Sequence, residues 1–187
     1  FRVEAEIIRD LSLATSGLLS PKIGGPSVFP PLPAGVADLS YANNFKWNPS
    51  KGEDRYRRGM YTFFKRTSPH PNLLTFDCPD SNVTCVKRTR SNTPLAALAT
   101  LNNEVFTEAA KALGKRMLAA SKTDTERLTA GFQICVARKP DIREMAALTN
   151  LLHRARVYYK GNEATAKTFN GDAEASAWAI IARVLQN

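Results

Sequence analysis

The chain has 187 residues, of which 43% are hydrophobic and 23% are charged, and its formal net charge is +9. This length suits one domain with a full core, and the composition is that of a folded globular protein rather than a disordered chain. No run of about 18 apolar residues occurs, so the sequence contains no candidate for a membrane-spanning helix. The positive charge favours anionic partners such as anionic polysaccharide, nucleic acid or acidic lipid.

The sequence opens with an amphipathic helical pattern. Apolar residues recur at helical spacing at Val3, Ile7, Leu11 and Ala14. Charged residues, Arg9 among them, occupy the opposite face, and Ser16–Gly17 ends the pattern. Because the pattern is already under way at Phe1, we expect the chain to be a fragment of a longer protein.

Residues 18–92 form an irregular tract that is rich in proline, glycine and basic residues. Its proline and glycine content excludes regular helix and central strand. Its apolar side chains, such as Val28 and Phe29, predict that it packs on the helices. Met60–Phe64 has the composition of a strand, and Leu73–Phe76 and Val83–Val86 are weaker candidates. We therefore expect a β element of two or three strands at most.

Residues 93–187 read as successive helices. Thr93 is a suitable N-cap before Pro94, Thr123–Glu126 has the spacing of a capping box, and Asp172 caps the last helix. Pro140 ends the third of these helices, Gly161 ends the fourth, and a polar loop follows. The apolar positions in register are Val105, Phe106, Ala109, Leu113, Met117, Leu128, Phe132, Cys135, Met145, Leu148, Leu152, Ala155, Tyr159, Trp178, Ile181 and Leu185.

Short connections between these helices favour antiparallel packing. The predicted fold is therefore mainly α. An antiparallel helical bundle (93–187) carries the irregular basic tract (18–92), and residues 1–187 form a single domain.

Several classes of active site are excluded by their missing motifs. The sequence has no Cys-x-x-Cys-His for covalent haem, no His-Glu-x-x-His for zinc, no phosphate-binding loop and no Gly-x-Ser-x-Gly elbow. His70 lies in a turn between two prolines, and His153 lies on an exposed part of a helix. We assign no catalytic residue, no metal site and no cofactor to this chain.

An arginine cluster is the best candidate for a binding site. Its members are Arg55, Arg57, Arg58, Arg88 and Arg90, followed by Thr93 at a helix start. Forked guanidinium donors beside a helix N-terminus suit a carboxylate, sulfate or phosphate. The alternative is an internal clamp, in which the arginines pair with nearby carboxylates: Glu53, Asp54, Asp77 and Asp80. We place the clamp slightly ahead of the anion pocket.

The three cysteines divide into a pair and a single residue. Cys78 and Cys85 are close enough in sequence to form a disulfide, whereas Cys135 falls on the apolar side of a helix. Arg88 or Arg90 could supply the electropositive surroundings that a reactive thiol needs, but no histidine is placed by sequence to act as its base. A structural role or a local disulfide is favoured.

Several ordered motifs together resemble one known family. They are Glu4–Asp10, Gly24–Pro30, Asp54–Phe63, Phe76–Pro79, Cys85–Arg90, Ser91–Leu98 and Ala177–Leu185. The chain is similar to a planctomycete secreted domain of unknown function that occurs near the C-terminus of large cytochrome-c-like proteins. The resemblance implies an extracytoplasmic location and neighbouring domains, some of which bind haem. Relatives often have Ala where Cys78 stands, which makes Cys85 the better match, and no catalytic residues carry over.

Three functions follow, in order of preference. The first is a non-catalytic helical module that packs against neighbouring domains of a large exported, cytochrome-c-associated protein. The second is a domain that binds or degrades an anionic polysaccharide, such as a sulfated one, through the arginine cluster. Nucleic-acid binding comes last, because no recognisable reading helix with interleaved aromatic residues accompanies the high pI.

Overall fold

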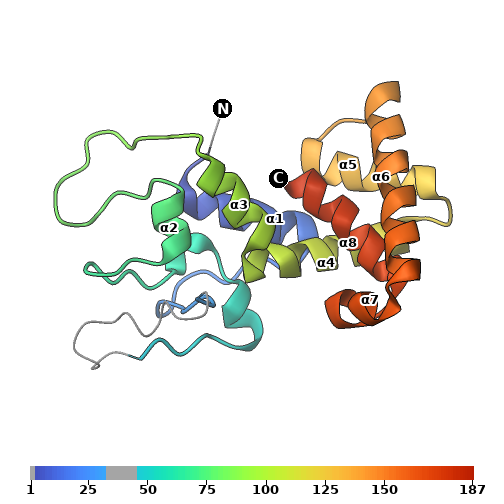
Figure 1. Ribbon diagram of the computed structural model, residues 1–187. Helices are drawn as coiled ribbons and strands as arrows, with labels where there is room; N and C mark the ends of the chain where they lie inside the picture. Colours follow the sequence, from blue (N-terminus) through green and yellow to red (C-terminus); the bar gives the residue numbers. More distant parts are fainter. Residues whose placement is uncertain (1–2, 33–45) are drawn as a thin grey trace. The chain divides into compact units, whose positions relative to one another are not determined.

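The computed structural model describes residues 3–32 and 46–187 (Figure 1). The part of the irregular tract between residues 33 and 45 lies outside this description. The chain divides into two compact units. Unit 1 comprises Phe1–Ala14 and Leu18–Val105, and unit 2 comprises Thr15–Gly17 and Phe106–Asn187. The single domain inferred for residues 1–187 stays a prediction.

Unit 1 combines short helices with irregular chain. Its elements are α1 (Ala5–Ser16, whose last two residues belong to unit 2), the 3-10 helices η2 (Gly52–Tyr56) and η3 (Gly59–Tyr61), α2 (Pro71–Thr75) and α3 (Pro94–Asn102). The described part of the chain contains no β-strand, and two isolated bridges, Ser20–Arg57 and Val28–Thr62, replace the expected β element. Residues 73–75, expected as part of a strand, lie in α2.

The buried face of α1 differs from the predicted one. Ile7 and Leu11 are 43% and 50% exposed, whereas Arg9 is buried. The buried positions are Ala5, Arg9, Ser12, Leu13 and Ser16. The Arg9 guanidinium donates to the backbone carbonyl oxygen of Arg55 over 2.5 Å, which gives its charge a polar partner inside the fold. A residue assigned by the pattern to the charged, exposed face is therefore buried, as a long side chain with a polar tip allows.

Gly59 allows α1 and η3 to approach closely. A Cβ atom at Gly59 would lie 2.9 Å from the Cα of Glu6, closer than a real Cβ contact. The Gly59 amide donates to the carboxylate of Asp10 over 2.6 Å. Gly59 must therefore lack a side chain, because the backbone of α1 lies so close to it.

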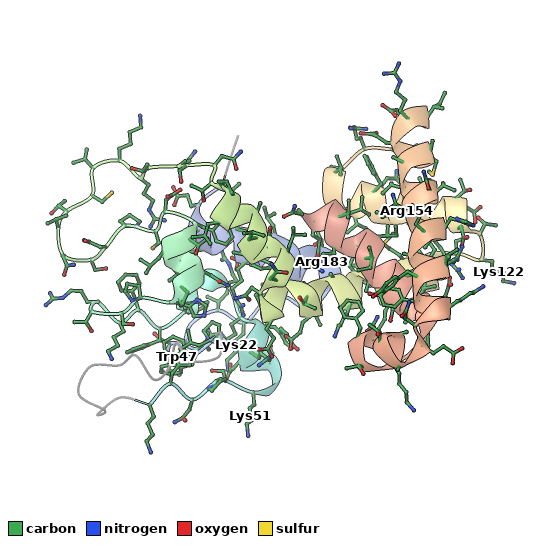
Figure 2. The ribbon with its side chains drawn as sticks, in the orientation of Figure 1. Lys22, Trp47, Lys51, Lys122, Arg154 and Arg183 are labelled. Carbon is green, nitrogen blue, oxygen red and sulfur yellow. The ribbon has the colours of Figure 1, made fainter. Side chains whose placement is uncertain are left out.

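An aromatic cluster of Phe29, Trp47 and Phe63 contacts His70 through the ring of Trp47. The ring of Trp47 (labelled in Figure 2) lies 5.1 Å from that of Phe29 and 5.7 Å from that of His70, centroid to centroid. The Phe63 ring lies 4.9 Å from that of Phe29. His70 is also the N-cap of α2, because its Nδ1 accepts from the amide of Asn72 over 3.2 Å.

Unit 2 is built from helices that pack around a shared hydrophobic core. They are α4 (Glu104–Ala120, whose first two residues belong to unit 1), α5 (Asp124–Val136), α6 (Ile142–Gly161), α7 (Glu163–Asn170) and α8 (Ala173–Gln186). α8 packs against α5, α6 and α7 (Figure 1). Trp178 of α8 is fully buried among the core residues, with Leu113, Leu128 and Leu152. The mainly helical fold is therefore confirmed, whereas the expected polar loop after Gly161 is largely α7.

Ionic contacts join the helices of unit 2. Arg156 of α6 donates to Asp124 of α5 and, through Nε over 2.9 Å, to Glu174 of α8. The Trp178 indole donates to the same Glu174 over 2.8 Å. The hydrogen bond from Arg156 holds the pKa of Asp124 below its usual value. Within the described ranges, no helix combines the length and the apolar character needed to cross a membrane.

Candidate functional site

The candidate site lies beside a loop of unit 1 whose two ends are joined by hydrogen bonds. The carboxylate of Asp77, just after α2, accepts from the Ser91 amide over 2.7 Å and from the Ser91 hydroxyl over 2.9 Å. Asp77 has a φ of 62°, in the left-handed region that Asp tolerates better than most residues. We call residues 78–90 the thiol loop, and the Asp77–Ser91 contact its neck.

Arginines of the thiol loop connect it to α1 and the residue before it. Arg88 Nη1 lies 2.7 Å from a Glu4 carboxylate oxygen and 2.9 Å from one of Glu6. Arg90 lies 3.5 Å from Glu4. The hydrogen bond from Arg88 to Glu6 is the main cause of a raised pKa for the guanidinium. Two carboxylates thus compensate the charge of these arginines.

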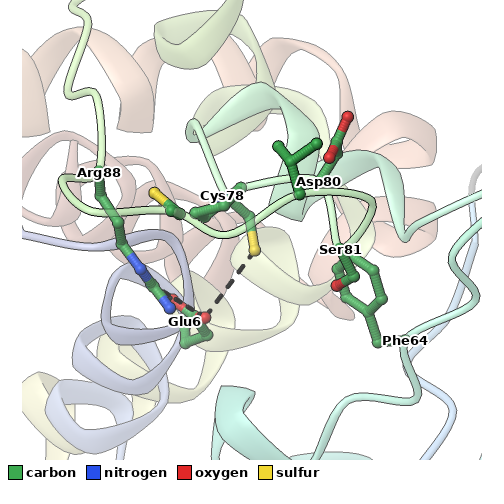
Figure 3. A pocket seen from close by; sticks show the side chains of 9 residues that line it. Glu6, Phe64, Cys78, Asp80, Ser81 and Arg88 are labelled. Carbon is green, nitrogen blue, oxygen red and sulfur yellow. Dashed lines mark hydrogen bonds and ion pairs between the residues drawn. The ribbon is translucent and has the colours of Figure 1, made fainter.

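A pocket of about 380 Å³ lies between the thiol loop and the adjoining chain (Figure 3). The side chains that line it include Glu6, Phe64, Cys78, Asp80, Cys85 and Arg88. Figure 3 shows Cys78 and Arg88 both directed toward the carboxylate of Glu6. Among the described residues, no group of three or more His, Cys, Asp or Glu side chains is placed to hold a metal ion.

The two thiols of the pocket differ in their surroundings. Cys78 is half-buried and its Sγ donates to Glu6 Oε1 over 3.9 Å, whereas Cys85 is exposed. Burial, and then the Glu6 charge, raise the pKa of the Cys78 thiol, although Arg88 acts in the opposite direction. Cys78 is therefore a protonated thiol beside a carboxylate acceptor. All three cysteines are free in this structure, so the Cys78–Cys85 disulfide stays a prediction.

Cys135 has surroundings of another kind. It packs, half-buried, against the hydrophobic core of unit 2, where burial raises the pKa of its thiol to about 11. Its position agrees with the predicted role as a small hydrophobic residue.

The other predicted site residues lie at separate places in unit 1. Arg55 pairs with Glu104 over 2.6 Å, and Arg58 pairs with Asp10 over 3.3 Å. The Thr93 hydroxyl accepts from the Ala96 amide over 3.2 Å and so caps α3, as predicted. Each of these residues has a partner within the chain, and Arg88 is the member of the predicted arginine cluster that lines the pocket.

Arg57 is enclosed almost completely, with 1% of its surface exposed. Its guanidinium donates to the carbonyl oxygens of Pro26 and Gly24 and stacks on the ring of Tyr61, 3.8 Å from the centroid. The Tyr61 hydroxyl in turn accepts from the Gly24 amide over 2.7 Å. Arg57 therefore fastens the Gly24–Pro26 turn to η3. Binding of an external anion by Arg57 stays a prediction.

The expected carboxylate partners of these arginines differ from the observed ones. Glu53 accepts from the hydroxyl of Ser20, Asp54 pairs with Lys22, and Asp77 accepts from Ser91. The arginine partners are instead Glu4, Glu6, Asp10 and Glu104. Sequence reasoning missed these four carboxylates, because three precede the arginines by about 48 residues or more and nothing local indicates the pairing.

Comparisons with known proteins place the chain in a family. No curated protein and no solved structure matches it. A family profile named PSD1, described as "Protein of unknown function (DUF1553)", matches residues 1–152. The matched range contains the thiol loop, its pocket and the predicted arginines. Because the match spans most of its length, the chain belongs to the PSD1 family of unknown function.

Proposed function

We propose that this chain is a non-catalytic helical module of a large exported, cytochrome-c-associated protein, and that it packs against neighbouring domains of that protein. The exposed surface of α3 is the observation that carries this proposal. α3 has no charged residue, yet Leu95 is 62% exposed and Leu98 is 54% exposed. Helices that are apolar on all sides are normally covered by other protein. The adjoining helix α2 adds an exposed Leu74.

The arginine contacts support a structural role for unit 1. Arg55, Arg58 and Arg88 are paired with carboxylates of the same chain, and Arg57 is enclosed by backbone carbonyl groups. An anion would have to displace these partners before it could bind. The clamp is therefore the better interpretation of the cluster.

Hydrogen exchange measured on the whole parent protein and on this chain alone tests the packing proposal. We expect the α3 amides to exchange more slowly in the parent, because a neighbouring domain covers them. Substitution of both Leu95→Lys and Leu98→Lys should abolish that difference and leave the Tm of the isolated chain nearly unchanged. Ile142→Lys, at a 90% exposed position of α6, is the matched control. Equal exchange of α3 in the two proteins would overturn the proposal.

The location and the haem-binding neighbour are parts of the same proposal. A planctomycete source, an extracytoplasmic location and a neighbouring domain with covalent haem rest on the resemblance in the motifs. Fractionation of cells and the absorbance spectrum of the purified parent protein test them. If the parent protein is cytoplasmic and shows no haem absorbance, the extracytoplasmic location and the haem-binding neighbour are refuted. The packing role would not be affected.

Binding of anionic polysaccharide is the second candidate function. Arg58 and Arg90 favour it, because their side chains remain 47% and 45% exposed beside their carboxylates. Retention on a sulfated polysaccharide column should then fall in Arg58→Gln and Arg90→Gln while the Tm is kept. If neither variant loses retention, polysaccharide binding through these arginines is refuted.

A further inference from the structure

The pocket beside the thiol loop joins three features that disulfide chemistry requires. It is lined by two thiols, Cys78 and Cys85, which are separated by six residues in sequence. Cys85 is accessible to a reagent in solution, whereas Cys78 is half-buried. A carboxylate of Glu6 accepts the S–H of Cys78. The neck and the Arg88 contacts hold the ends of the loop.

We propose that Cys78 and Cys85 form an intramolecular disulfide in this pocket by exchange with a disulfide-bearing oxidant, with Glu6 as the proton acceptor for Cys78. This inference concerns a modification site and does not depend on the proposed packing function. It assigns each of the three residues a separate role.

The exchange proceeds in two steps. The Cys85 thiolate attacks one sulfur of the oxidant RSSR, which forms the mixed disulfide Cys85–S–S–R and releases RS⁻. Cys78 then transfers its proton to Glu6 while its sulfur attacks the Sγ of Cys85, which breaks the mixed disulfide and releases the second RS⁻. Both leaving thiolates take up the protons given by the two cysteines. The cysteines lose two electrons and two protons, and RSSR is reduced to two RSH.

The surroundings of the two thiols fix this order. An incoming disulfide reaches exposed Cys85 first, because Cys78 lies deeper and is held protonated beside Glu6. Once the mixed disulfide forms, its sulfur is presented to Cys78 within the same pocket. The S–H contact with Glu6 then becomes the route by which the second proton leaves.

Formation of the Cys78–Cys85 disulfide would constrain the thiol loop. The bond links residues 78 and 85, and thereby removes conformational freedom that the unfolded loop otherwise has. Glu6 gives up its contact with the thiol and keeps both carboxylate oxygens on Arg88, at 3.1 and 2.9 Å. The Arg88–Glu6 pair thus survives the oxidation.

Oxidised glutathione is the probe for the experiment. The reduced chain, after incubation with it, should show one titratable thiol in denaturant instead of three, and a mass lower by two hydrogens. The Tm of unit 1 should rise by roughly 5 °C or more. Cys135→Ser should form the same disulfide as the unsubstituted chain and should show no titratable thiol afterwards. Cys78→Ser should accumulate a stable glutathione adduct at Cys85. Three remaining thiols, or separate adducts on Cys78 and Cys85, would overturn the proposal.

A matched pair of variants tests the role of Glu6. Glu6→Gln removes the proton acceptor, so the second step should slow by roughly tenfold. This is a smaller effect than general-base catalysis usually gives. The Cys85 adduct should then accumulate transiently while the first step is unchanged. Glu4→Gln is the control, because Glu4 also pairs with Arg88 but makes no hydrogen bond to Cys78 among those observed. Equal slowing in both variants would refute the role of Glu6.

Discussion

His70 should make unit 1 sensitive to acid. Its Nε2 lies 3.1 Å from the carbonyl oxygen of Pro31, and its Nδ1 accepts from the Asn72 amide, so the neutral ring carries its proton on Nε2. Protonation would place a second proton on Nδ1 and break the N-cap of α2. It would also charge a ring that is buried beside Trp47.

The magnitude follows from the pKa of the ring. Burial lowers the pKa of His70 from 6.5 to about 4; the Pro31 contact opposes this and the charge of Arg9 adds to it. The unfolded chain therefore binds more protons than the folded chain between these pH values. The stabilisation is fully present above about pH 6.5 and is lost as the pH falls through about 4. At about 1.36 kcal/mol for each pKa unit, the loss is roughly 3 kcal/mol.

Urea denaturation between pH 3.5 and about 7.5, followed by Trp fluorescence and hydrogen exchange of α2, measures this loss. His70→Asn is the control, because Asn keeps a side-chain acceptor for the N-cap and does not titrate. This variant should be less stable at neutral pH but should lose the part of the pH dependence that His70 contributes. NMR of the His70 ring gives its pKa directly. A ring that titrates near 6.5, or an unchanged pH dependence in His70→Asn, would refute the reasoning.

Three further substitutions test the packing of both units. Gly59→Ala should lower stability by about 3 kcal/mol because its Cβ would meet the backbone of α1, whereas Gly161→Ala, with open space around it, should leave urea denaturation unchanged. Ala137→Gly should raise the free energy of unfolding by about 1 kcal/mol, since this C-cap has a φ of 59°; an unchanged midpoint would argue against strain there. Arg156→Gln should lower the stability of unit 2 by about 2 kcal/mol, and exposed Arg154→Gln should not. Equal effects on Tm would contradict a stabilising role for the Arg156 contacts with Asp124 and Glu174.

Helical periodicity predicted unit 2 well, because its helices bury wide apolar faces. Leu113, Leu128 and Trp178 all fall where the pattern placed them. α7 escaped detection because it is only eight residues long, lacks a side-chain cap, and its buried position is the small Ala166. Weak periodicity and a missing cap leave such a helix without a sequence signal.

Unit 1 was harder to predict because its contacts are distant in sequence. The cysteine pair and Arg88 were recognised as notable, but the convergence of Cys78 and Arg88 on Glu6 joins residues up to 82 positions apart. The pattern of α1 was misleading, because Arg9 is buried through a backbone carbonyl contact. Hydrophobic periodicity records which residues are apolar and cannot show which charged residue will find a buried acceptor.

The Asp77–Ser91 neck has a consequence for how this region tolerates change. One carboxylate joins the two ends of the thiol loop, so we expect α2 and α3 to keep their paths when the tip of the loop changes. Lengthening a loop raises the entropic cost of closing it only slightly, since each doubling of its length costs about 0.6 kcal/mol. Insertions at its tip, or new chain ends made there by circular permutation, should leave unit 1 folded. The neck makes this segment the natural place for homologous chains to differ in length.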